Sequence, residues 1–400
     1  MAAKDSAFPL RRGSDASEKD FFDIPDESWS AMAKRQLRHI RTWVILFALI
    51  VYCLWPKSIP LPPQPNPHIH YDEVDWTRYA YTTYATSETD LCNSLMVYAA
   101  LQRFQSKAET LLFYPDEWDL IIDDDSDRIS ELLIMAKSRY NVQMSPIKVE
   151  PIKRPSERFA DATWDVSSAK LNAFGVIQYD RVIHLDSDIT LLNHMDELFF
   201  LPPTVVAMPR AYWTLPNSHT LNSQIVVIEP SYKEFLGLQE MTRLATHGQL
   251  DIWNGTVGLD TAILNFRYGD SAMVLPHKEY GLLTSEFRRK EHKKFLGTEK
   301  DWIPDKVMSE SKFVQFSDDP LPKPWVMWPQ EMLAEIQPKC DTKPGTAQES
   351  GCRDRELWKE LYDHFRRQRK VCMPLLCVGV RGWVHSVLTT LFFDRTFAGY

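Results

Sequence analysis

The sequence has little glycine, few cysteines and no excess of positive charge, and each shortage argues against a class of protein. Only 14 of the 400 residues are glycine and no fixed-period repeat is visible, which argues against solenoids, propellers and collagen-like chains. The 46 lysines and arginines are outnumbered by 54 acids, so the net charge is −8 and nucleic acid is not an expected partner. No Cys/His cluster has zinc-like spacing. With 44% hydrophobic residues, the chain is expected to be globular.

A long hydrophobic run is also missing, yet a membrane anchor is predicted. The uncharged run WVILFALIVYCLW at 43–55 has 13 residues, fewer than the roughly 17–25 of a typical spanning helix. Four basic residues without an acid precede it, and a proline-rich stretch follows it, which favours a single-pass anchor over a signal peptide or a buried helix. The basic residues are Lys34, Arg35, Arg38 and Arg41.

The predicted order is a cytoplasmic tail at 1–41, a signal-anchor at 42–56 and a proline-rich stem at 57–75. Everything after the anchor is then lumenal, in a type II membrane protein. A short apolar span fits the thin membranes of the early secretory pathway, which favours the endoplasmic reticulum or Golgi. Five cysteines follow the anchor, an odd number, so at least one stays unpaired, and their spacing leaves the pairing open. They are Cys92, Cys340, Cys352, Cys372 and Cys377.

From residue 76 to about 330, short apolar runs alternate with helical patterns, which predicts an α/β domain with a mostly parallel sheet. The expected strands are Tyr79–Ala85, Thr110–Tyr114, Asn141–Met144, Arg181–Leu185, Val205–Met208 and Ser223–Ile228. Helical spacing is seen in three groups of apolar positions: 91, 95, 98 and 101; 129, 132, 133 and 136; and 171, 174 and 177.

Residues 331–400 are predicted to form a C-terminal helical extension. Its segment Glu356–Arg369 places Leu357, Leu361 and Phe365 on one face, as in a helix packed on a core. The apolar stretch 371–393 is interrupted by proline and charge, so a packed or interfacial segment is favoured there over a second span.

The most informative motif is Asp186-Ser187-Asp188, directly after the apolar strand at 181–185. Side chains in extended chain alternate, so the two carboxylates are expected on one side. Two neighbouring acids repel each other, and a hard divalent cation such as Mn²⁺ or Mg²⁺ relieves that repulsion while accepting phosphate oxygens. A solvated turn is the simpler interpretation of the same three residues.

Two chemistries fit this motif. In one, the cation neutralises the diphosphate of a nucleotide-sugar while the glycosidic bond breaks. In the other, the DxDxT run at 186–190 belongs to a phosphatase of the haloacid dehalogenase type, with Asp186 as nucleophile and Asp188 as general acid. About 110 residues of α/β pattern precede the motif, enough for a nucleotide-binding half, and this favours the transferase.

Six ordered blocks then resemble glycosyltransferase family 8, the glycogenin-like retaining enzymes. They are YATSETDLCNSLMVYAAL, SSAKLNAFGVIQYDRVIHLDSD, LNSQIVVIEPS, GLDTAILN, LPHKEYGLLTSEFR and FSDDPLPKPW. Within the family, the chain is most similar to the anchored Golgi N-acetylglucosaminyltransferases called glucose N-acetyltransferases. The resemblance implies a GT-A type fold, a Rossmann-like mixed sheet with flanking helices. It also implies transfer of a sugar, N-acetylglucosamine, from a UDP-sugar to a glycan acceptor.

The resemblance assigns roles by position. Asp186 and Asp188 are expected to bind the metal and diphosphate, with Ser187 between them, and Lys323 to hold the departing diphosphate as a catalytic cation. Asp260 is expected to hold the donor sugar and is the one motif acid available as a catalytic nucleophile. The remaining residues implied to contact the donor are Thr83, Tyr84, Ala85, Thr86, Lys170, Asn222 and Ser223. A solvated helix face is the simpler interpretation of Lys170, and strand surface that of 83–86; Trp325 is expected to be structural.

Three departures from the family pattern keep a third hypothesis open. Gln315 stands where the family has a metal-binding histidine, and Gln224 where a glycine is common. Thr261 and Ala262 follow Asp260 where family members carry an acid or an amide. A catalytically weak homologue that binds nucleotide-sugar or glycan would fit these changes. For an active enzyme, double displacement through Asp260 and front-side attack both remain open.

Overall fold

The computed structural model describes residues 71–122, 127–149, 152–153, 164–252, 258–318, 321, 323–326, 328–342, 349–350 and 352–372. The predicted tail, anchor, most of the stem, Cys377 and the apolar stretch after residue 372 lie outside these ranges. Within them, no helix combines the length and the apolar character that a bilayer-spanning segment requires. Packing begins inside the predicted stem, since the ring of Tyr71 lies 5.8 Å from those of Trp76 and Phe200.

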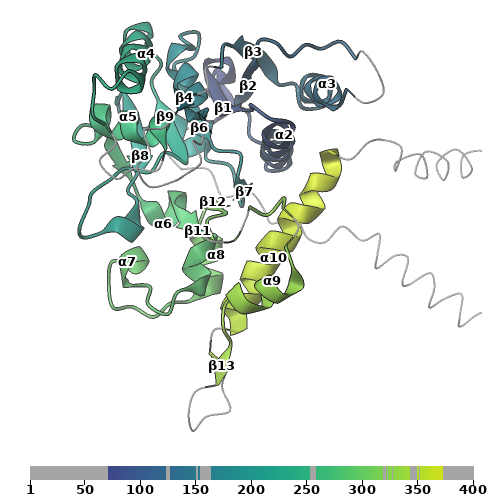
Figure 1. Cartoon of the computed structure of the whole chain (residues 1–400), viewed down its shortest axis with the longest axis vertical. Coiled ribbons are helices and arrows are strands. Elements are labelled where there is room, and N and C mark those ends of the chain that lie inside the picture. The colour runs from purple at the N-terminus through teal and green to yellow at the C-terminus, as the bar shows by residue number, and fades with distance from the viewer. Residues whose placement is uncertain are drawn as a thin grey trace, which may run out of the picture. The chain divides into compact units, whose positions relative to one another are not determined.

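A seven-stranded mixed sheet in the order β10-β8-β9-β6-β1-β2-β3 forms the centre of the domain (Figure 1). Strand β9 runs antiparallel to both neighbours, and every other neighbouring pair is parallel, so the expected mostly parallel α/β sheet is confirmed. The strands are β1 (Tyr79–Tyr84), β2 (Glu109–Pro115), β3 (Gln143–Ile147), β6 (Arg181–Leu185), β8 (Val206–Pro209), β9 (Ile225–Ile228) and β10 (Met273–Leu275).

Helices cover both faces of this sheet, because its strands are apolar on both sides. On one face, α2 (Glu88–Arg103) and α3 (Arg128–Tyr140) pack on a cluster that includes Tyr81, Ile183 and Leu185. The opposite face is covered by three other helices around Val182. They are η3 (Ser167–Gly175), α4 (Tyr232–Thr246) and α5 (Leu259–Tyr268).

Two local predictions are corrected. The pattern at 171, 174 and 177 forms a 3-10 helix that ends at Gly175, and Ile177 is 63% exposed. A spacing of three residues suits that tighter helix, and Gly175 lies against the ring of Phe235, where a Cβ would be only 3.2 Å from it. The strand expected from residue 141 begins at Gln143, because Asn141 is left-handed (φ 53°) and ends α3.

A smaller three-stranded sheet, in the order β11-β12-β7, lies beside the acidic motif that follows β6. Its strands are β11 (Leu282–Leu283), β12 (Phe313–Gln315) and β7 (Ile189–Leu191). Four short helices accompany it, η6 (Thr284–Arg288), α6 (His277–Tyr280), α7 (Lys293–Leu296) and α8 (Pro304–Glu310). Because β7 follows Asp188 directly and pairs with β12, this sheet brings Gln315 to the motif.

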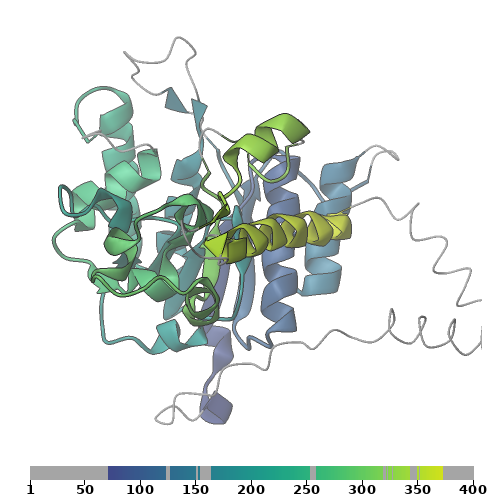
Figure 2. The ribbon, with the colours of Figure 1, turned by 90° about the horizontal axis from the view of Figure 1, so that it is seen from below.

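The C-terminal extension folds onto the small sheet. It contains α9 (Gln330–Ile336), α10 (Cys352–Gln368) and η7 (Arg369–Cys372), beside the two-residue strands β13 (Asp341–Thr342) and β14 (Glu349–Ser350). The predicted packing of Leu357, Leu361 and Phe365 is confirmed, since all three are buried with Trp358 in a third apolar cluster. Figure 2 shows α10, in yellow, extending to the side of the domain where the blue N-terminal helices lie.

Two disulfides close the extension onto itself and onto the sheet domain. Cys92 of α2 is bonded to Cys372, and Cys340 to Cys352. The spacing of the cysteines along the chain does not specify this pairing. A further antiparallel pair, β4 (Ile152–Lys153) and β5 (Trp164–Asp165), precedes η3.

Candidate active site

The predicted site residues meet at the carboxyl ends of β1 and β6. These strands are parallel neighbours, with Thr82 beside His184. The residues that follow, at 83–86 and 186–188, therefore emerge at the same edge of the sheet. Ligands of open α/β sheets bind at such edges, so the topology alone brings the predicted nucleotide-binding residues to the acidic motif.

Lys170 lies at the centre of a buried ionic cluster. Its Nζ is 2.7 Å from Asp186 Oδ1 and 2.7 Å from Asp260 Oδ2, and it donates a hydrogen bond to the carbonyl of Ser223 at 2.8 Å. The side chain is only 2% exposed. The solvated-helix interpretation of Lys170 is therefore wrong: the first turn of η3 points this ammonium between two acids.

The charges in this cluster change one another's pKa values. Burial raises the pKa of Asp186 to about 6, with repulsion from Asp188 and Asp260 adding to the effect of burial and Lys170 opposing both. Burial by itself lowers the pKa of Lys170, yet attraction to the two acids makes the net shift upward. Burial opposes ionisation of Asp260, yet its pKa is lowered, because the charge of Lys170 and hydrogen bonds from Lys170, Ser223 and Ser167 together outweigh burial. Lys170 therefore stays protonated, and Asp186 is the acid that binds a proton most readily.

Asp188 forms a second cluster with residues from far along the chain. Its Oδ2 is 2.6 Å from Nζ of Lys323, and its two oxygens lie 3.1 and 3.4 Å from Nε2 of Gln315. Lys323 is 43% exposed and Asp188 17%, so the ammonium of this pair faces solvent, whereas Lys170 and Asp260 are buried beside it. Trp325 packs near Phe365 of α10, at 6.1 Å between ring centroids, which fits the structural role expected of it.

Hydroxyl and amide groups complete the wall beside Asp260. Ser223 Oγ donates to Asp260 Oδ2 at 2.7 Å and lies 2.7 Å from Oγ1 of Thr261. The side-chain amide nitrogen of Asn222 is buried, with no hydrogen-bond partner among the described residues. A buried donor without a partner is costly, so Asn222 is suited to an oxygen of a ligand.

The segment 83–86, which includes the last two residues of β1, is not uniform. Thr83 is fully buried and its hydroxyl is 2.7 Å from that of Tyr98, so its side chain belongs to the core rather than to the strand surface. Tyr84 is half-buried and its ring stacks on His184, with centroids 5.9 Å apart. Ala85 is buried, and the hydroxyl of Thr86 donates to Asp90 at 3.3 Å.

Two residues in this area were missed by the sequence analysis. Ser167 accepts a hydrogen bond from the backbone N–H of Asp260 at 3.2 Å, and it opens the same block that contains Lys170. His184 is fully buried two residues before Asp186, and its Nε2 has no hydrogen-bond partner among the described residues. The one available signal, for His184, was a polar residue among the apolar residues Val182, Ile183 and Leu185.

The donor set for a cation consists of hard oxygens. Asp186 and Asp188 supply carboxylates. The Gln315 amide has its nitrogen toward Asp188 and would supply a carbonyl oxygen after rotating by half a turn. In the described ranges, no group of three or more His, Cys, Asp or Glu side chains is placed to hold a metal ion. The set fits Mn²⁺ or Mg²⁺, which take carboxylate, carbonyl and phosphate oxygens, provided that a diphosphate completes the coordination.

A separate cavity of about 530 Å³ lies along α5. Its lining includes Arg210, His219, Asp251, Asn265 and Phe266, and none of the predicted site residues contributes to it.

Comparison with known proteins finds close relatives in sequence. No protein-family model matches the chain. Glucose N-acetyltransferase 1 of Aspergillus fumigatus is 56% identical over 371 residues, covering 92% of this chain and 96% of that protein. Glucose N-acetyltransferase 1 of Gibberella zeae is 42% identical over 322 residues, 78% of this chain and 66% of that protein. Among solved structures, the glycosyltransferase GlyE of Streptococcus pneumoniae superposes with a TM-score of 0.43 at 17% identity, over 72% of this chain and 60% of that one.

Proposed function

Because the chain belongs to the glucose N-acetyltransferase 1 family and is a glycosyltransferase, we propose that it transfers N-acetylglucosamine from a UDP-sugar to a glycan acceptor in the Golgi lumen. The observation that carries this proposal is the pair of ionic clusters at the end of β6. Lys170 with Asp186 and Asp260, and Lys323 with Asp188, place two cations and three acids at one sheet edge. Such a set can hold a diphosphate and a divalent cation together.

In this proposal, Asp186 and Asp188 hold Mn²⁺ or Mg²⁺ with Gln315 beside them. When bound, the cation supplies positive charge that stabilises the departing diphosphate. Lys323 leaves Asp188 and contacts the diphosphate instead, since a flexible ammonium can follow the shifting negative charge. Thr83 to Thr86 and Ser187 contribute to the pocket for the nucleotide, Thr83 through its backbone.

Asp260 is better suited to positioning the donor sugar than to attacking it. Its side chain is 6% exposed, and Oδ2 already accepts from Lys170 and Ser223. A nucleophilic carboxylate needs a free lone pair facing the anomeric carbon. Front-side attack, in which the leaving phosphate takes the acceptor proton, needs no such carboxylate, and we favour it. Asn222 and Ser223 then line the sugar position beside Asp260.

The experiment is UDP release by the purified protein from UDP-N-acetylglucosamine with Mn²⁺ and mannose-terminated oligosaccharides. The substitution Asp188→Ala is expected to reduce release by at least about 100-fold, because it removes a ligand of the cation and the partner of Lys323. Asp180→Ala is the matched control: this aspartate precedes β6 at its other end and pairs with Arg78 on the surface. Release that survives both Asp188→Ala and EDTA would contradict the metal assignment. A covalent phosphate on Asp186 would instead favour the phosphatase.

The arrangement around Gln315 supports the weaker, binding-only function as a second candidate. Its amide nitrogen, not its oxygen, lies toward Asp188, and a third His, Cys, Asp or Glu ligand is missing among the described residues. Nucleotide binding in a calorimeter without turnover of any acceptor would favour this candidate. Transfer detected as a mass shift of the oligosaccharide would exclude it.

The proposed location rests on the sequence of the N-terminal region. The basic residues at 34–41, the apolar run at 43–55 and the prolines after it support a type II anchor. Two disulfides in the following domain are typical of proteins that fold in an oxidising compartment. In sealed microsomes, the domain is expected to resist added protease until detergent is present. Cleavage without detergent would contradict a lumenal domain.

A further inference from the structure

Asp318 is a buried carboxylate whose three side-chain partners play no part in the proposed chemistry. Its Oδ2 accepts from Nε1 of Trp358 at 3.1 Å and from the hydroxyl of Tyr362 at 2.6 Å. Its Oδ1 is 3.3 Å from the guanidinium of Arg288. The side chain is 1% exposed, and a buried carboxylate is stable only with such partners. Asp318 is thereby fixed to α10 and η6.

Phe316, two residues earlier, connects α10 directly to the acidic motif. Its ring lies 4.9 Å from those of Tyr362 and Phe365, both on α10. Its backbone N–H donates to the carbonyl of Asp188 at 3.1 Å, and its own carbonyl accepts from Lys323 Nζ at 2.7 Å. A shift of Phe316 would therefore move the contact that holds the Lys323 ammonium.

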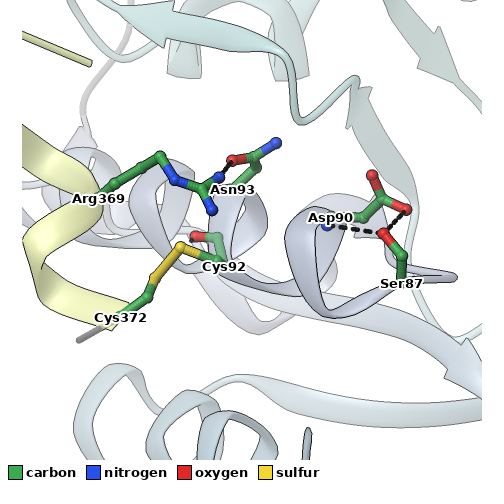
Figure 3. The surroundings of a disulfide bond; sticks show 6 residues. All are labelled: Ser87, Asp90, Cys92, Asn93, Arg369 and Cys372. Atoms are coloured by element: carbon green, nitrogen blue, oxygen red, sulfur yellow. Dashed lines mark hydrogen bonds between the residues drawn. A yellow bond between two sulfur atoms is a disulfide. The ribbon is translucent and has the colours of Figure 1, made fainter. Parts of the chain in front are cut away.

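The other end of the C-terminal extension is attached to α2. Figure 3 shows the Cys92–Cys372 disulfide, with the guanidinium of Arg369 donating to Asn93 beside it. In the same view, Ser87 and Asp90 form the first turn of α2, directly after the predicted nucleotide segment 83–86. The extension is thus attached to Phe316 beside the acidic motif and to α2, the helix that follows the predicted nucleotide segment.

From these contacts we infer that α10 is part of the transfer site, because it sets the position of Lys323 through the buried carboxylate of Asp318. Asp318 is a positioning residue: it touches Trp358, Tyr362 and Arg288, and acts through Lys323. The inference deepens the proposed function and rests on it. It concerns the leaving diphosphate, so the binding of UDP as a product should respond to changes in α10.

The test is a double-mutant cycle between α10 and Lys323. Tyr362→Phe removes one hydrogen bond to a buried charge and keeps the ring, so it is the gentler variant, and Asp318→Asn is the stronger one. Each is expected to lower kcat/KM by about tenfold and to raise the inhibition constant of UDP by a similar factor. In a Lys323→Met background, neither should lower kcat/KM by more than about twofold, because the residue through which they act is already lost.

Tyr179→Phe is the matched control. The hydroxyl of Tyr179 also donates to a carboxylate, Glu109 Oε2, at 2.7 Å, but it lies just before β6, at the end opposite Asp186. This variant removes the same kind of bond and is expected to leave kcat/KM and UDP inhibition within about twofold of wild type. Thermal unfolding of all variants separates loss of folded protein from loss of positioning.

Hydrogen exchange supplies a readout that does not need turnover. Tyr362→Phe should speed backbone exchange at Phe316, whose N–H donates to the carbonyl of Asp188, and Tyr179→Phe should not. If the wild-type protein transfers nothing, the proposed function fails while faster exchange still supports the positioning by α10. Unchanged exchange would overturn the inference, as would an equal fall in kcat/KM with and without Lys323.

Discussion

At the scale of single residues, the site is defined by how burial divides one group of charges. Lys170 and Asp260 are buried, Asp186 and Asp188 are partly exposed at 22% and 17%, and Lys323 is open to solvent at 43%. Burial costs the charged form of each group, and only attraction between opposite charges repays it. The cluster holds two acids against the single ammonium of Lys170, and Asp186 is the acid whose ionised form is least favoured. A divalent cation beside Asp186 relieves that cost.

The raised pKa of Asp186 predicts a stability that falls with rising pH. Its folded pKa is about 6 and its ordinary value is 3.8. The folded protein therefore binds this proton more tightly, and the contribution of Asp186 to the free energy of unfolding decreases as pH rises from about 4 through about 6. Asp186→Asn should raise the free energy of unfolding of the metal-free protein at pH 7.5, on the order of 1–3 kcal/mol.

Urea unfolding of wild type, Asp186→Asn and the surface variant Asp180→Asn at several pH values measures this effect. Asp180→Asn should have no comparable effect, since that carboxylate is 42% exposed. A lower stability of Asp186→Asn at pH 7.5 would show that the ion pair with Lys170 outweighs burial. The same protonation should weaken Mn²⁺ binding below about pH 6, because a protonated carboxylate no longer attracts the cation.

Gln315 is the second residue whose substitution is informative. The position lies on β12, beside Asp188, where the family pattern has a histidine. Gln315→His should tighten Mn²⁺ binding on the order of tenfold, because a neutral imidazole is a stronger ligand than an amide oxygen. Calorimetric titration with Mn²⁺ measures it, and Gln315→Asn is the control that keeps an amide. Equal affinities in all three proteins would mean that this position does not face the ion.

At the scale of elements, α10 and η7 differ from an ordinary terminal extension. The buried face of α10 closes the third apolar cluster, and η7 is bonded covalently to α2. The Cys92–Cys372 bond joins residues 280 positions apart, whereas Cys340–Cys352 closes a segment of only 12. A longer loop loses more chain entropy in the unfolded state when it is closed.

The two disulfides are therefore predicted to contribute unequally. Cys372→Ser should lower the free energy of unfolding by about 2–5 kcal/mol, and Cys352→Ser should lower it by less. Urea unfolding of the oxidised proteins measures both. The two variants should become indistinguishable from each other and from wild type when all are fully reduced. A larger loss from Cys352→Ser would contradict the loop-length argument.

At the scale of the whole molecule, the site joins three separately packed parts. Lys170 comes from η3, which packs on one face of the main sheet. Asp186 and Asp188 follow strand β6, and Lys323 comes from the segment that α10 holds. A ligand that contacts all three would stabilise the fold as a unit. This linkage allows binding to be measured without an acceptor.

UDP with Mn²⁺ should accordingly raise the melting temperature. At about 100 times the dissociation constant, the stabilisation is about 2.7 kcal/mol, which corresponds to a rise of several degrees. Differential scanning calorimetry measures it, with UDP alone, Mn²⁺ alone and Asp188→Ala as controls. The full shift should require both ligands and an intact Asp188. An equal shift with EDTA would indicate that UDP binds without a cation.

Much of this site could be predicted because its motifs are local. The apolar strand 181–185 and the acids after it are adjacent in the chain, so the motif could be located. That both carboxylates lie on one side stays a prediction, because 187–188 form a bend after β6 and the two acids pair with different lysines. The amphipathic face of 356–369 was readable because it is local as well. The helix expected around 171–177 was misjudged because a spacing of three fits both helix types. Its core packing at Gly175 was decided by Phe235, which lies far along the chain.

By itself, the amino-acid sequence determined the α/β class, the acidic motif at the end of a buried strand and the C-terminal amphipathic helix, because each depends on neighbours in the chain. The tertiary structure alone decided which cation meets which acid. Lys323 is 135 residues from Asp188, and Lys170 is sandwiched between acids from two different segments. Such pairings, like the two disulfides, depend on the order of strands in the sheet, and no local pattern of polarity specifies that order.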